Sequence, residues 1–179
     1  MAEEKKEPWF NWLALSTVVL ALCATMASFK GGGHSTRGVL SQTQASDQWS
    51  YYQSKSIKGY LYELQGDKLQ LELVAGGASM SPELQEAYRK RIESYQAKVQ
   101  KYETEKKLIE QKAKDLEALR DLSGRHSAAF GMAIIFLQIA ILLSSIAALT
   151  KKKPLWITGM AVGLIGVVHF LNGFYLFLR

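Results

Sequence analysis

Three long stretches of the chain carry no charged side chain, and they set its class. They are Trp9–Phe29, Ser127–Thr150 and Leu155–Leu178, with 21, 24 and 24 residues. A helix needs about 20 apolar residues to cross the roughly 30 Å of hydrocarbon in a bilayer. The pattern therefore predicts an all-α integral membrane protein with three transmembrane helices, preceded by a short mixed-charge tail over residues 1–8.

The second and third apolar stretches should form an antiparallel hairpin. Only Lys151–Pro154 separates them, and four residues allow no more than a tight reversal. Pro154 suits the first turn of the third helix, where its missing N–H is not needed. Basic residues of short loops favour the cytoplasmic side. We therefore expect Lys151–Lys153 and the N-terminus to be cytoplasmic.

The polar segment over residues 30–126 predicts a helical hairpin on the other side of the membrane. Apolar positions at three-, four- and seven-residue spacings indicate one amphipathic helix over residues 36–74. Ala75–Ser79 interrupts the pattern, and Ser81 and Pro82 are typical of the start of a second helix, over residues 82–122. The two helices should pair as an antiparallel coiled-coil stalk.

The second of these helices has a heptad repeat that predicts the seam of the stalk. Its apolar positions are Tyr88, Ile92, Tyr95, Val99, Tyr102, Ile109 and Leu116, and Lys106 interrupts one core layer. A row of tyrosines can also stack on bases or sugars, but strict heptad spacing favours a seam. Exposed aromatic residues such as Trp49 and Tyr62 indicate further packing, against other copies or a partner.

Glycines mark two further features. Gly31, Gly32 and Gly33 should end the first helix and act as a hinge, because glycine adopts backbone angles that other residues avoid. In the third apolar stretch, small residues at seam spacing predict close helix packing. These residues are Gly159, Gly163, Gly166 and Gly173.

Charge and composition narrow the function classes. The chain has 22 basic and 16 acidic residues among 179, a net charge of +6, and the charges between the first two spans are interleaved. This is typical of a solvated helix surface rather than a nucleic-acid interface. The single Cys23 gives no disulfide framework. No nucleophile–base pair, phosphate loop or cofactor motif is visible, so we expect no enzyme activity, cofactor or metal.

Few polar residues lie in the spans, and they form the candidate intramembrane site: Gln138, His169 and Asn172. Gln138 and His169 should lie at similar depth and hydrogen-bond between the second and third helices. Such groups either join helices or serve transport. His34 and His126 should lie near the same membrane face. They could contribute to a metal site, but no third ligand is near, so interfacial residues are the better interpretation.

One resemblance covers nearly the whole chain. The stretch from Phe29 to Arg37 and the aromatic stretch Gln44–Lys58 resemble a bacterial membrane-protein family catalogued as a domain of unknown function, number 4337. The order of anchor, glycines, aromatic helix, coiled coil and hairpin is also similar. The resemblance implies this architecture and a bacterial inner membrane, but no chemistry.

Two functions remain open at this point. The first is a structural or adaptor protein, a homo-oligomer in the lipid bilayer that organises another membrane complex through an extracytoplasmic stalk. The alternative is a small oligomeric channel or transporter subunit with polar residues facing a pore. The two differ in whether Gln138, His169 and Asn172 line water or protein.

Overall fold

The computed structural model describes residues 8–178 and is all-α over that range. Helix α1 runs over Trp9–Gly76, α2 over Pro82–Thr150 and α3 over Lys153–Tyr175, and a 3-10 helix over Gly77–Ser79 follows α1. Each α-helix contains a segment long and apolar enough to cross a membrane. The expected N-terminal tail falls almost entirely on residues 1–7, outside the described part.

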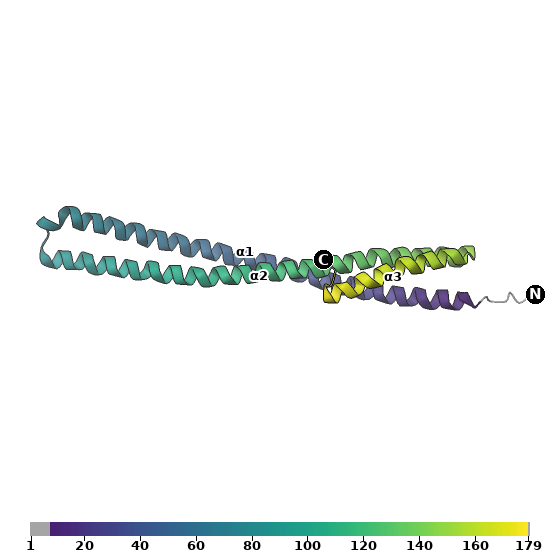
Figure 1. Ribbon diagram of the computed structural model, residues 1–179. Coiled ribbons are helices and arrows are strands. Elements are labelled where there is room, and N and C mark those ends of the chain that lie inside the picture. Colours follow the sequence, from purple (N-terminus) through teal and green to yellow (C-terminus); the bar gives the residue numbers. More distant parts are fainter. Residues whose placement is uncertain (1–7, 179) are drawn as a thin grey trace, which may run out of the picture. The chain divides into compact units, whose positions relative to one another are not determined.

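The chain divides into two compact units, which are described separately. The three-helix unit comprises Met1–Leu40 and Leu119–Arg179, and the two-helix unit comprises Ser41–Ala118. Within the three-helix unit, the first half of α1, the second half of α2 and all of α3 lie side by side (Figure 1). Within the two-helix unit, the rest of α1 packs along the first half of α2.

The glycine run does not end the first helix. The predicted helix end and hinge at Gly31–Gly33 are therefore wrong, because the helix continues without a break. Gly31, Gly32 and Gly33 are helical inside α1, and no described glycine has a positive φ. Each glycine costs a helix about 1 kcal/mol relative to alanine, which neighbouring hydrogen bonds and packing can offset. For the same reason Gly124 lies inside α2, which continues past the expected boundary near residue 122.

The turns follow the expected chemistry. The Ser81 hydroxyl accepts a hydrogen bond from the Leu84 N–H at 3.3 Å, which caps the start of α2. Between α2 and α3, Lys151 has a φ of 51° and Lys152 is the N-cap of α3. Pro154 lies in the first turn of α3, as the sequence predicts. The reversal is therefore tight.

Helix α3 ends at Tyr175, three residues earlier than the expected Leu178, because Asn172 caps it. The Leu176 N–H donates to the Asn172 carbonyl at 2.8 Å, with Leu176 at a φ of 51°. The Leu178 N–H donates to the Asn172 side-chain Oδ1 at 2.7 Å. These bonds satisfy groups that a helix end would otherwise leave unpaired.

The core of the three-helix unit is built from small and medium apolar side chains. Phe130 and Leu137 of α2 are fully buried, and Leu20 of α1 is 4% exposed. Around Phe130, Phe170 and Phe174 of α3 pack edge-on at centroid distances of 6.1 and 5.1 Å. The core comprises two apolar clusters, one that contains Phe130 and Leu137 and another that contains Trp9 and Ala147, and most of the outer surface of the unit is apolar as well.

The two-helix unit is held by the tyrosine row of α2. Tyr102 and Tyr95 lie against Gly59 and Gly66 of α1, where an added Cβ would meet the tyrosine Cβ atoms at 3.7 and 3.9 Å. Tyr62 of α1 packs on both tyrosine rings, at 5.4 and 5.9 Å between centroids. Gly59 of α1 contacts Tyr102 of α2, and Gly66, one heptad later on α1, contacts Tyr95, one heptad earlier on α2. The two helices are therefore antiparallel.

Candidate functional site

The three polar residues of the spans do not form one site. Gln138 is exposed, and neither Gln138 nor His169 makes a side-chain hydrogen bond within the described part of the chain. The His169 ring is half-buried and stacks on Phe136 at 5.7 Å. The expected Gln138–His169 bond is therefore wrong. Asn172 is buried and occupied in capping α3.

His34 and His126 do meet, at the polar end of the three-helix unit. Their rings stack at 4.5 Å between centroids with an interplanar angle of 18°, and Phe130 lies beyond at 6.0 Å from His34. His126 Nδ1 lies 2.8 Å from the Gly173 carbonyl oxygen. A carbonyl only accepts, so Nδ1 carries the proton. This contact ties α2 to the end of α3.

The electrostatic surroundings of the histidine pair are basic. Burial lowers the pKa of His34, and the nearby charges of His126, Arg37 and Lys30 lower it further. His34 is therefore neutral at pH 7. Within residues 8–178, no three His, Cys, Asp or Glu side chains come together in a way that could hold a metal ion.

The four glycines of α3 lie at helix contacts. A Cβ at Gly159 or Gly163 would lie 3.1 Å from the nearest side-chain atom, of Leu143 or Leu20 respectively. At Gly166 and Gly173 the space is smaller, with Leu137 at 2.8 Å and Phe130 at 2.5 Å. At these contacts α3 packs against both α1 and α2, and the close approach depends on residues that have no side chain.

The stalk seam contains one buried charge. Lys106 is 7% exposed, and its ammonium donates to Glu103 at 2.7 Å. It also lies over the rings of Tyr52 and Tyr60, at 5.4 and 5.6 Å from their centroids. An ammonium between aromatic faces is attracted by their electron density. The lysine that interrupts the heptad thus fits into the helix pair.

Polar ties between α1 and α2 flank that lysine. Lys55 of α1 forms an ion pair with Glu105 at 2.6 Å, which lowers the pKa of Glu105. Trp49 Nε1 donates to Glu117 at 2.8 Å, and the Tyr88 hydroxyl donates to Glu72 at 3.2 Å. The other predicted seam residues, Ile92, Val99, Ile109 and Leu116, are buried or half-buried on the same helix. These contacts set the register of the pair.

Sequence reasoning missed an apolar stripe on the outer side of α1 in the two-helix unit. Its members are Ile57 (53% exposed), Tyr60 (62%), Leu61 (55%), Leu64 (64%), Leu71 (71%) and Val74 (80%). Leu64 lies two residues from both Tyr62 and Gly66, so it is roughly 200° around the helix from the face that packs on α2. The seven-residue spacing of Ile57, Leu64 and Leu71 was the available signal.

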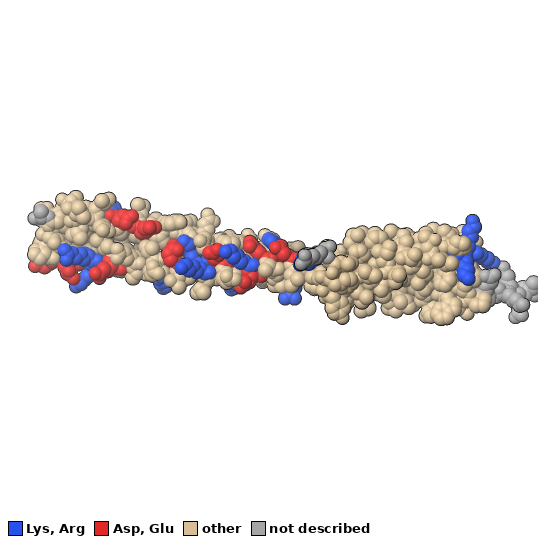
Figure 2. All heavy atoms as spheres, viewed as in Figure 1, with Lys and Arg blue, Asp and Glu red and all other residues tan. Residues whose placement is uncertain are grey.

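That signal was hidden because the apolar positions of α1 form two faces, not one. Ala45 is 1% exposed on the α2 side, whereas the stripe residues are more than half exposed. Around them the unit is solvated: Figure 2 shows acidic and basic side chains mixed along its visible face. The visible face of the three-helix unit is uncharged along most of its length, with basic side chains at one end.

Comparison with known proteins identifies a family but brings no activity. No curated protein and no solved structure matches the chain. A family model matches residues 9–176, which include all three helices and both units. The chain therefore belongs to the family described as Domain of unknown function (DUF4337).

Proposed function

We propose that the protein is a membrane-anchored structural adaptor that assembles with copies of itself through its two-helix unit. The three-helix unit lies in the bilayer, and the two-helix unit is the stalk. The observation that carries this proposal is the apolar stripe on α1, from Ile57 to Val74.

Physical reasons favour a second copy of the chain on this stripe. Ile57, Leu64 and Leu71 repeat every seven residues, the spacing at which helices pack as coiled coils. The surrounding surface carries charges of both signs, so it is exposed to water, where a continuous apolar row is costly. A second stripe of the same kind would cover it and leave the charged positions solvated.

The oligomer mass of purified full-length protein in lipid discs tests the proposal. We expect more than one chain for the wild type, and a single chain for the double variant Leu64→Lys with Leu71→Lys. Leu108→Lys is the matched control, because Leu108 is 70% exposed on α2, outside the stripe. A wild type that remains a single chain across detergents and discs would contradict the proposal.

A channel remains the second candidate, because of Gln138. This amide is exposed on α2 within the span over residues 127–150, where contact with lipid tails would leave it unpaired at a cost of several kcal/mol. It therefore needs either water or a partner chain. Ion flux in vesicles that is lost in Gln138→Leu, with oligomer mass unchanged, would favour the channel over the adaptor.

For the topology, we propose that Lys151–Lys153 and the N-terminus lie in the cytoplasm of a bacterial inner membrane and the stalk outside. The short α2–α3 turn carries three consecutive lysines, as the positive-inside rule favours. The test introduces a cysteine at Ser79 or Lys152 in a variant lacking Cys23 and treats intact cells with a thiol reagent. An impermeant thiol reagent should label Ser79→Cys and not Lys152→Cys; the reverse would invert the topology.

A further inference from the structure

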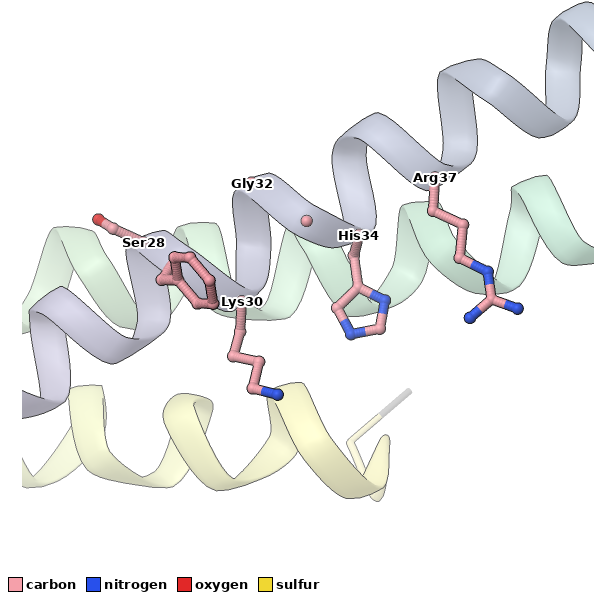
Figure 3. Close-up of a pocket in the computed structure, with 7 residues that line it drawn as sticks. Ser28, Lys30, Gly32, His34 and Arg37 are labelled. Atoms are coloured by element: carbon pink, nitrogen blue, oxygen red, sulfur yellow. The ribbon is translucent and has the colours of Figure 1, made fainter.

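An open hollow in the three-helix unit is lined by residues of α1 alone. It lies beside the last turn of the first apolar stretch and is lined mainly by Phe29, Lys30, Gly32, Gly33, His34 and Arg37. Figure 3 shows the side chains of Lys30, His34 and Arg37 leaving α1 on the same side. Apolar and basic groups thus share one small surface.

The packing of the unit explains only the first of the three adjacent glycines. A Cβ at Gly31 would come within 3.0 Å of Phe130, so this position must be small. A Cβ at Gly32 or Gly33 would meet nothing within 4 Å. Glycine in a helix allows a molecule to approach the backbone closely. Gly32 and Gly33 therefore leave room for something outside the chain.

The charge around the hollow selects an anion. Lys30 and Arg37 form no ion pair within the part of the chain that the structure describes. The described part of the three-helix unit has seven Lys or Arg residues and one acidic residue, Asp121, which Arg120 already contacts at 2.8 Å. If a second copy packed on this face, the Lys30 and Arg37 side chains of the two copies would lie close together. Like charges therefore oppose self-association here.

We propose that this hollow binds the headgroup of an anionic phospholipid. The phosphate lies between Lys30 and Arg37, the glycerol lies over Gly33, and an acyl chain runs beside Phe29, which is 80% exposed. Lys30 and Arg37 are two helical turns apart, about 10 Å along the axis, and their side chains are long enough for both to reach one phosphate between them. The half-buried His34 forms the inner wall against His126. This inference rests on the proposed membrane anchoring, not on self-association.

The test measures which lipid stays bound to the full-length protein. Wild type is reconstituted with equal amounts of phosphatidylglycerol and phosphatidylcholine, extracted in mild detergent, and its retained lipids are counted by native mass spectrometry. We expect phosphatidylglycerol to be enriched. Because a basic residue that contacts an anionic headgroup contributes roughly fivefold to its binding, Lys30→Gln with Arg37→Gln should reduce the enrichment about thirtyfold.

Two matched variants separate the site from general charge and from folding. Lys151→Gln with Lys152→Gln removes the same charge from the α2–α3 turn and should retain the enrichment. Gly33→Leu places a side chain in the hollow at a position where an added Cβ meets nothing within 4 Å, and it should lose the enrichment. Gly124→Leu, where an added Cβ likewise meets nothing within 4 Å, should retain it. Thermal unfolding of each variant confirms that it folds.

Several results would overturn the proposal. Unchanged phosphatidylglycerol enrichment in Gly33→Leu would show that the hollow is not the site. Equal loss in the lysine control would show a general charge effect. A change in oligomer mass in Gly33→Leu, with enrichment retained, would assign the hollow to a second copy. Wild type that inserts and oligomerises without preferring the anionic lipid refutes this inference alone, whereas failure to insert refutes the anchoring as well.

Discussion

The two units join their helices by opposite means. In the three-helix unit, contacts form where side chains are missing, as at Gly166 and Gly173 against Leu137 and Phe130. In the two-helix unit, they form through large polar side chains such as Tyr62 and the buried Lys106. In the bilayer proposed for the three-helix unit, apolar side chains gain little by leaving the lipid tails, so close backbone approach would drive helix association. Water favours broad aromatic contacts and charge pairs instead.

The largest effect should come from the residue on which the three-helix unit converges. Phe130 is fully buried and contacts Phe170, Phe174 and the glycine face of α3. Phe130→Ala should lower the free energy of unfolding by about 3–5 kcal/mol. Leu149→Ala, at a residue 84% exposed on the same helix, should change it little. Thermal unfolding followed by circular dichroism in mild detergent measures both.

Adding a methyl group should damage the three-helix unit as well. In Gly166→Ala, the new Cβ would lie 2.9 Å from the Leu137 backbone nitrogen, and backbone cannot move aside easily. We expect a loss of about 1–3 kcal/mol. Gly131→Ala is the control, because a Cβ there meets nothing within 4 Å. If both variants behaved alike, packing through missing side chains would not distinguish this unit.

A smaller effect should separate the two units by their polar contacts. Trp49 donates to the charged Glu117 in the two-helix unit, whereas Trp156 donates to the neutral Ser16 hydroxyl at 3.1 Å in the three-helix unit. Hydrogen bonds to charged groups contribute about 1.5–3 kcal/mol and neutral ones about 0.5–1.5. Trp49→Phe should therefore destabilise more than Trp156→Phe in the same unfolding assay. The opposite order would contradict the comparison.

The smallest effect concerns pH and should come from the three-helix unit alone. The pKa of His34 is below its ordinary value, so the unfolded state binds a proton more readily than the folded state. Stability is then complete above about pH 6.5, the ordinary value, and decreases as the pH falls below it. The unfolding midpoint should drop less between pH 7.5 and 5 in His34→Gln than in wild type.

The two-helix unit should not respond to pH between 7.5 and 5, so it serves as an internal reference. It contains no histidine, and the ion pair with Lys55 lowers the pKa of Glu105. Contacts of the tyrosine row should therefore persist throughout the titration. An equal pH response in wild type and His34→Gln would show that His34 is not the group responsible.

The sequence predicts the elements well because their signals are local and strong. Charge-free runs of at least 21 residues, the cap at Ser81 and the first-turn position of Pro154 are set by composition over a few residues. The positions where helices end are set less locally. The helix continues through Gly31–Gly33, where only Gly31 packs against another helix, and α3 stops at Tyr175 because Asn172 accepts hydrogen bonds from the residues that follow. Neither can be read from periodicity.

The sites depend still more on which faces meet. Gln138 is exposed on α2 while the half-buried His169 stacks on Phe136, so spacing along each helix predicts their proximity wrongly. The apolar positions from Ile57 to Val74 indicate a single amphipathic helix in the sequence, whereas the structure shows that this helix carries two apolar rows. Which of the two rows packs in the helix pair is known only once the position of α2 is known. The stacking of His34 on His126 likewise joins residues 92 positions apart.

The contacts of Gly59 and Gly66 with Tyr102 and Tyr95 have a consequence for how length can change in evolution. Both sets repeat every seven residues, so the ladder looks the same after a shift of one repeat and does not encode its own alignment. The alignment is instead marked by contacts that do not repeat, among them Lys106 between Tyr52 and Tyr60 and the pair of Lys55 with Glu105. Removing one repeat from each helix beyond these marks should shorten the structure without scrambling it. Relatives of different length would then differ by whole multiples of seven.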